Sequence, residues 1–176
     1  MAYTTVDNPE LYFQTKLYTG NSSTQSITFD GSENMQPDWV WSKARSQSDN
    51  SAVIDSVRGG QKQLRSNTKD AELTRTDAIS SFDSNGFSMG SQAELNSNSV
   101  TYVAWNWKAG GSASNNTDGS TTTSVSNNST AKFSIGTYTG TSSAATIGHG
   151  LGAAPGIIII KNRSSGTRDW AVYHRD

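Results

Sequence analysis

The apolar residues of this chain occur almost entirely in short runs, each bounded by glycine, proline, asparagine or aspartate. Such runs are typical of β-strands, whereas a helix in a globular protein needs a longer periodic segment. The most strand-like runs are residues 27–29, 39–43, 52–54 and 102–108. In the last run, Val103, Trp105 and Trp107 occupy alternate positions and therefore share one face of a strand. The pattern predicts a chain built from β-strands.

Turn and helix signals lead to the same fold class. Residues 82–87 contain Asn85-Gly86, a pair that tolerates the positive φ angles of a tight hairpin turn. Residues 70–78 are a helix candidate, but they have no apolar stripe, and we expect helix in less than about 10% of the chain. The expected fold is all-β, an antiparallel β-sandwich of jelly-roll-like form.

Charge and cysteine content exclude several classes of function. Charged residues make up 16% of the chain and the net charge is −1, so the basic surface that nucleic-acid binding requires is missing. The absence of cysteine excludes disulfides and thiolate zinc sites, and it fits synthesis in a reducing cytosol. The longest aliphatic run, Ile157–Ile160, is too short to span a membrane, and the N-terminus has no apolar signal core. We therefore expect no nucleic-acid partner and no membrane insertion.

Composition divides the chain into four parts. Residues 1–16 are interpreted as an N-terminal arm, and residues 17–108 as a first β-sandwich repeat. Residues 109–130 are almost free of apolar side chains, which predicts a flexible linker rich in Ser, Thr, Asn and Gly. Residues 131–176 resemble the start of the first repeat and are interpreted as a second, truncated one.

The two repeats share residues at matching spacing. Phe13 and Phe133 each precede a Tyr-Thr-Gly sequence by the same distance, at residues 18–20 and 138–140. A proline, a lysine and an arginine then follow in the same order, as Pro37, Lys43 and Arg45 in the first copy and Pro155, Lys161 and Arg163 in the second. This order indicates an internal repeat. Because half a sandwich leaves open strand edges, we expect the missing strands to come from residues beyond Asp176 or, alternatively, from another chain.

Five segments carry a resemblance to a known family. They are residues 12–45, 55–60, 82–90, 101–111 and 155–175. Together they look like the tandem β-domains in virion structural proteins of marine tailed bacteriophages, such as those that infect cyanobacteria and pelagic α-proteobacteria. The resemblance implies sandwiches similar to concanavalin or laminin-G domains, a structural role and no catalytic residues. One departure is that Ser42 and Ala44 of the first copy correspond to Ile160 and Asn162 of the second.

Four tryptophans are the candidate binding residues. Trp39 and Trp41 are separated by one residue, as are Trp105 and Trp107, so each pair shares a strand face. Aromatic faces can stack on sugar rings, which makes a host surface glycan a possible ligand. The alternative, which the sequence favours, is that these side chains fill the core of the sandwich.

The sequence shows no clear catalytic or metal-binding pattern. The two histidines, His149 and His174, have no nucleophilic serine or orienting acid that the sequence places beside them. Asp30 and Asp83 stand in turns that could offer oxygen ligands to calcium, but ordinary turn chemistry explains these turns better. We therefore expect no catalytic residues, no metal site and no cofactor.

Residues 1–16 carry apolar side chains without a periodic pattern, namely Tyr3, Leu11, Tyr12 and Phe13. Asn8-Pro9 favours an extended or turned entry, so the arm gains little by folding alone. We expect it to anchor the chain to neighbouring proteins of the particle. The alternative is that the arm packs back on its own sandwich, with Phe13 as the first core residue.

These features predict a non-enzymatic virion protein that assembles with other tail or capsid proteins. The favoured role is a tail-associated fibre or spike component, anchored by its N-terminus, whose β-sandwiches bind the host surface. The alternative is a capsid decoration or capsid-fibre protein bound to the major shell lattice. Both roles predict a homo-oligomer, because virion parts follow the symmetry of the particle.

Overall fold

The computed structural model describes residues 6–175, and the chain is 39% strand and 4% helix. The all-β fold class and the low helix content are therefore confirmed. The two helices of the described part are η1 (Pro9–Leu11), a 3-10 helix, and α1 (Ala93–Asn96). Neither has the length and apolar character needed to cross a membrane. Residues 70–78 contain the short strand β6 (Leu73–Thr74) instead of a helix.

Six strands form the main sheet, and every neighbouring pair in it is antiparallel. Their order across the sheet is β1 (Phe13–Thr19), β9 (Thr101–Trp107), β3 (Trp39–Ala44), β4 (Ala52–Asp55), β5 (Lys62–Arg65) and β6. Strand β9 lies between β1 and β3, although it is the last of the six in the sequence. Trp107 is thereby aligned with Phe13 on one side and with Trp39 on the other.

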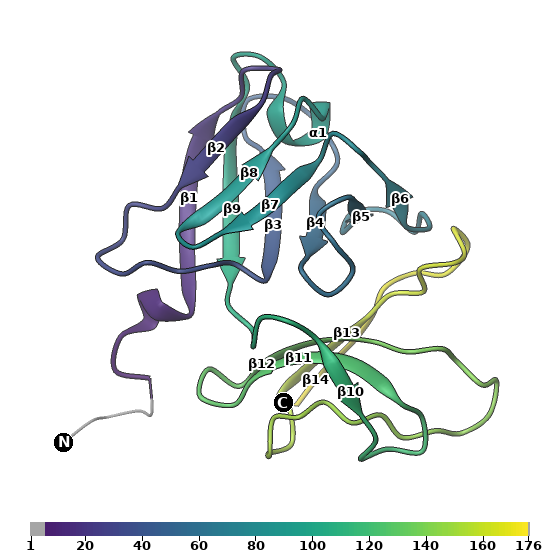
Figure 1. Ribbon diagram of the computed structural model, residues 1–176. Coiled ribbons are helices and arrows are strands. Elements are labelled where there is room, and N and C mark those ends of the chain that lie inside the picture. The colour runs from purple at the N-terminus through teal and green to yellow at the C-terminus, as the bar shows by residue number, and fades with distance from the viewer. Residues whose placement is uncertain (1–5, 176) are drawn as a thin grey trace.

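A three-stranded antiparallel sheet packs over one face of the main sheet (Figure 1). Its order is β2 (Gln25–Thr28), β8 (Gly86–Met89) and β7 (Ile79–Asp83). Buried side chains from both sheets form one core, which includes Ile27, Val40, Ile54, Ile79, Phe87 and Ala104. Removal of this apolar surface from water is the main force that holds the two sheets together.

Strands β7 and β8 form the hairpin that the sequence predicts at residues 82–87. Asp83 is aligned with Gly86, so Ser84 and Asn85 make the two-residue loop. Gly86 has a φ of 125°, and a Cβ atom there would collide with the carbonyl oxygen of Ile27 on β2. The glycine is therefore required both by its backbone conformation and by the close approach of β2.

Residues 109–175 form two smaller sheets, in the lower part of Figure 1. One has the order β10 (Ser114–Asn116), β11 (Thr123–Asn128) and β12 (Phe133–Thr137). The other pairs β13 (Ile157–Ile160) with β14 (Ala171–His174). We refer to residues 13–108 as the first unit and to residues 109–175 as the second unit.

Strands β10 and β11 lie where the sequence predicts a flexible linker, residues 109–130, and that prediction is wrong. Strand β11 is paired with β12 along its length except for its first residue, and Val125 and Ile135 are buried. Serine, threonine and asparagine can occupy a strand when a neighbouring strand supplies the backbone hydrogen bonds. The low apolar content of residues 109–130 therefore did not prevent order, because β12, which pairs with β11, lies outside that segment.

Strand β1 begins at Phe13, inside the segment predicted as an arm. Ahead of it, the side chain of Asn8 accepts a hydrogen bond from the Glu10 backbone N–H (3.1 Å) and so caps η1. The Glu10 carboxylate accepts hydrogen bonds from the Ser32 hydroxyl (2.6 Å) and backbone N–H (2.7 Å), and these bonds lower the pKa of Glu10. The residues just before β1 are thus fastened to the loop that contains Ser32.

Candidate functional site on the outer sheet face

The four predicted binding tryptophans lie on the outer face of the main sheet, on the side away from the core. In β3 and β9, the residues that point into the core include Val40 and Ala104, and side chains alternate between the two faces. Trp39 and Trp41 therefore point outward, as do Trp105 and Trp107. The preference for a core position is wrong for these residues, because Tyr102 and Ala104, and not the tryptophans, occupy the inner face of β9.

The tryptophans form two groups on this face. Trp41 and Trp105 are aligned partners on β3 and β9, and their rings meet edge to face with centroids 5.8 Å apart. The Trp41 indole N–H also donates to the Ser66 hydroxyl (3.0 Å). Both side chains are only partly buried. We term Trp41 and Trp105 the open tryptophan pair.

The other two tryptophans are covered by the second unit. Trp107 lies between Phe13, at a centroid distance of 4.8 Å, and Phe133 of β12, at 6.2 Å. Trp39 meets Phe133 edge to face at 6.4 Å. These four residues form the closed aromatic cluster, in which Phe133 contributes the contact between the units. Pairs of this kind add about 0.5–1.5 kcal/mol each beyond their area burial.

The open tryptophan pair has apolar and polar neighbours on the same face. Thr15 and Leu17 of β1 are aligned with Trp105 and Val103, and Lys43 is aligned with Val103 from the other side. Leu17 is 56% exposed. The face therefore offers aromatic edges and an exposed aliphatic group beside a lysine and a threonine, which suits a ligand with both apolar and hydroxyl surface. Leu17 was missed by sequence reasoning, although its alternation with Phe13 and Thr15 could have revealed it.

The predicted anchoring residues lie in different elements and make different contacts. Tyr3 lies outside the described residues. Leu11 ends η1, and Tyr12 follows it, both only partly buried. The ring of Phe13 packs against Trp107 of its own unit. Phe13 is therefore a member of the closed aromatic cluster and not a free anchoring group.

A second junction joins the loop of the β13–β14 hairpin to β5 and β6. The Trp170 indole N–H lies within hydrogen-bonding distance of the backbone carbonyls of Arg65 (3.0 Å) and Thr68 (3.1 Å). The Lys161 ammonium donates to the carbonyl of Lys69 (3.1 Å). Lys161 is one of the residues on which the predicted repeat rests, and here it contributes to the contact between the two units.

Glu72 is the charged centre of this junction. Its carboxylate binds Arg163 from the hairpin loop and Arg58 (3.0 Å), which in turn pairs with buried Asp55 (2.6 Å). Burial alone would raise the pKa of Glu72, but the hydrogen bonds from Arg163 and Arg58 outweigh it and lower that pKa. Glu72 had no sequence signal, because its partners come from distant positions.

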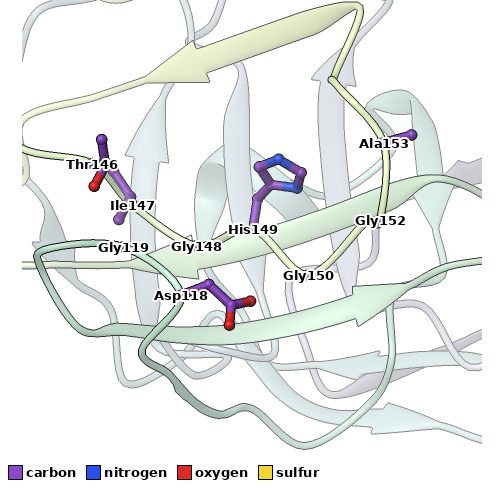
Figure 2. A pocket seen from close by; sticks show the side chains of 9 residues that line it. All are labelled: Asp118, Gly119, Thr146, Ile147, Gly148, His149, Gly150, Gly152 and Ala153. Carbon is purple, nitrogen blue, oxygen red and sulfur yellow. The ribbon is translucent and has the colours of Figure 1, made fainter.

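The second unit also has a shallow hollow of about 390 Å³, whose lining includes Asp118 and His149 (Figure 2). The two side chains point in different directions. The Nδ1 atom of His149 accepts from the Leu151 backbone N–H (3.2 Å), and the Asp118 carboxylate accepts from the side chain of Asn116 (2.9 Å). Each group thus supports its own loop, and the pair is not aligned for proton transfer.

The turns considered for calcium make local contacts. Asp30 forms an ion pair with Lys16 (3.0 Å), whose hydrogen bond and charge lower the pKa of Asp30. The Asp83 carboxylate accepts from the hydroxyls of Ser81 (2.6 Å) and Ser88 (2.7 Å). Residues 6–175 contain no cluster of three or more His, Cys, Asp or Glu side chains placed to hold a metal ion.

Comparison with known proteins identifies a family. The family model described as "Domain of unknown function (DUF7483)" matches residues 8–176. The match spans both units. No curated protein and no solved structure matches the chain significantly.

Proposed function

We propose that this chain, which belongs to the family of the domain of unknown function DUF7483, is a structural protein of a tailed-bacteriophage virion. Its role is that of a tail-associated fibre or spike component. It assembles as a homo-oligomer with other virion proteins after synthesis in the bacterial cytoplasm, and it has no enzymatic activity. The basis is the resemblance of its segments to tandem β-domains of phage virion proteins, together with the face described above.

The finer architecture that we propose is a jelly-roll-like β-sandwich followed by a partial second copy. Two structural matches between the units support it. The first match is a pair of asparagine turns. The Asn128 side chain accepts a hydrogen bond from the Thr130 backbone N–H (3.1 Å), as the Asn8 side chain does from Glu10. Asn128 stands five residues before Phe133, and Asn8 stands five residues before Phe13. Both asparagines thus begin the turn that leads into the corresponding strand, β12 or β1.

The second match is the register of two hairpins. After Pro37, β3 pairs with β4 from Trp39↔Asp55 to Ser42↔Ala52. After Pro155, β13 pairs with β14 in the same pattern, from Ile157↔His174 to Ile160↔Ala171. Since register fixes which side chains share a face, equal registers support a common origin of the two hairpins.

The observation that carries the binding role is the outward position of the open tryptophan pair beside exposed Leu17. Large exposed apolar groups on a sheet face are typical of interaction sites. Aromatic residues supply rigid contact area at low entropic cost. We propose that this face binds a glycan of the host surface.

Binding by this face is tested with the purified full chain and cells of the bacterium that the phage infects. Leu17→Glu changes an exposed side chain and should fold normally, and Trp105→Ala removes half of the open pair. Both variants are expected to bind cells at least tenfold more weakly. Thr28→Glu, which adds the same charge at an exposed position of β2, in the sheet that covers the opposite face, is the matched control and should bind like the original chain. Unchanged binding of both face variants would contradict the glycan proposal.

The location is tested separately, with gold-labelled antibody against the chain on intact particles of a phage that encodes it. Gold at the tail supports the fibre or spike role. Gold spread over the head would overturn that role in favour of capsid decoration. Unlabelled particles that lack the chain by mass spectrometry would contradict a virion protein altogether.

A further inference from the structure

The β13–β14 hairpin exposes apolar side chains on both of its faces. Its six large apolar residues are between 39% and 65% exposed, namely Ile157, Ile158, Ile159, Ile160, Val172 and Tyr173. In the first unit, the residues that match Ile158 and Tyr173 are Val40 and Ile54, and each of these is only 1% exposed. An isolated two-stranded hairpin is at best marginally stable in water, so this apolar surface calls for a partner.

One edge of β13 has unpaired backbone groups. The Arg175 N–H donates to the Gly156 carbonyl (2.8 Å), so Gly156 and the residues at even positions of β13 direct their backbone groups toward β14. Ile157 and Ile159 therefore direct their N–H and C=O groups to the opposite edge. No strand of residues 6–175 pairs with that edge.

The same edge is occupied in the first unit. Strand β3, whose hairpin register matches that of β13, pairs with β4 on one side and with β9 on the other. The β9 pairing extends over all of β3, from Trp39↔Trp107 to Ala44↔Tyr102. We propose that the free edge of β13 binds an antiparallel strand that has the residue pattern of β9 and whose own edge is unpaired.

The side chains at the edge support this occupant. In the first unit, Ser42 of β3 is aligned with Ala104 of β9. The residue of β13 that matches Ser42 is Ile160, which is larger. An added strand with alanine opposite Ile160 leaves space for this larger side chain. Edges that avoid strand addition usually carry charged residues or proline, and β13 consists of four isoleucines. Lys161, the next residue, is already bound to the Lys69 carbonyl. Nothing within β13 therefore opposes the addition of a strand, and backbone pairing supplies the affinity.

The test uses the full chain and a synthetic peptide with the sequence of residues 99–111, which contains β9. Amide hydrogen exchange is followed by NMR at the four isoleucines of β13. The peptide is expected to slow exchange at Ile157 and Ile159 at least tenfold. Exchange at Ile158 and Ile160 should change little, because their amides already face β14. A peptide with Trp105→Pro, which lacks an N–H that β9 directs toward its β3 partner, should have no effect.

A variant pair in the chain checks the position of binding. Ile159→Pro removes an N–H that faces the free edge and should abolish the response to the peptide, whereas Ile159→Val should retain it. Peptide protection at another strand, or none at Ile157 and Ile159, would overturn the proposal. Protection that rises with protein concentration in the absence of peptide would also overturn it. Because β9 of a folded chain is already paired on both edges, a second β13 would then be the occupant. The inference rests on the matching hairpins and not on the virion role, so its failure would leave the antibody experiment unaffected.

Discussion

Arg163 and Glu72 face each other across the junction of the two units, with the guanidinium Nε and Nη2 atoms each 2.8 Å from a different carboxylate oxygen. The Glu72 backbone N–H also donates to the Arg163 carbonyl (2.9 Å). Side chain and backbone thus bind the same partner residue, which fixes the hairpin loop against β6. A two-pronged arginine–carboxylate contact gives directional specificity that a lysine could not supply.

Arg163→Ala is expected to release the hairpin loop at a cost of about 1 kcal/mol, since the arginine is partly exposed and its contribution is reduced by solvent. The Trp170 indole N–H reports docking, because it is bonded to carbonyls of the first unit. Its NMR signal should shift toward that of a solvent-exposed indole in the variant. Arg168→Ala, at an exposed position of the same loop, should leave the signal in place.

Docking of the loop should weaken in acid. The pKa of Glu72 is lower in the folded chain than its ordinary value of 4.5, so the charged form stabilises the folded state. This contribution is complete above pH 4.5 and is lost as the pH falls through the lowered pKa. The Trp170 indole signal should therefore move toward the exposed position below about pH 4.5. In Glu72→Gln the signal should already be displaced at neutral pH, and the part of its acid response that comes from Glu72 should disappear.

Tyr102→Ala should destabilise the first unit by about 3–5 kcal/mol, the usual cost of emptying a large buried site. Tyr102 is fully buried, stacks on Tyr18 at 5.1 Å and donates its hydroxyl proton to the Ala93 carbonyl (2.9 Å). Trp105→Ala, on the outer face of the same strand, should cost only about 1–2 kcal/mol, since the ring is already partly in water. Urea unfolding of both variants measures the difference. An equal loss would place Trp105 in the core.

The tryptophans show where sequence reasoning stops. The run at 102–108 identifies a strand, and the structure confirms β9, but Tyr102 and Ala104 are apolar as well as Trp105 and Trp107. Alternation then defines two apolar faces without saying which one meets the second sheet. The inner face carries Ser42 and Ala104 at aligned positions, and this pairing across strands is invisible in the sequence. The hairpin at Asn85-Gly86 could be predicted because its cause is local.

Gly86→Ala should destabilise the first unit by about 2 kcal/mol or more, because the substitution adds backbone strain and a collision with the Ile27 carbonyl. Gly59→Ala is the matched control. Gly59 also has a positive φ, of 97°, but a Cβ atom there would meet no neighbour within 4 Å. Gly59→Ala should therefore lower the stability of the first unit only through backbone strain, by about 1 kcal/mol. Equal thermal shifts for the two variants would show that the approach of β2 is not tight.

Val40→Thr and Ile158→Thr place the same side chain at matching positions of the two hairpins. The first should cost about 1–3 kcal/mol, because a hydroxyl in the core lacks a hydrogen-bonding partner. The second should change stability by less than about 0.5 kcal/mol, because Ile158 is exposed in the chain alone. Chemical denaturation of each variant tests this. A large loss for Ile158→Thr would mean that the second hairpin is buried in solution.

The place of β9 between β1 and β3 sets the order of events as the chain is made. Until residue 107 leaves the ribosome, β1 has no strand to pair with and the β3–β4 hairpin has one bare edge. Local hairpins such as β7–β8 can form during synthesis, but the main sheet is complete only when β9, the last of its strands in the sequence, inserts between β1 and β3. Such long-range closure is slow, on the order of milliseconds to seconds for β-rich domains. A nascent chain of this kind spends its synthesis with two unpaired strand edges, the interval in which association with a neighbouring nascent chain competes most strongly with folding.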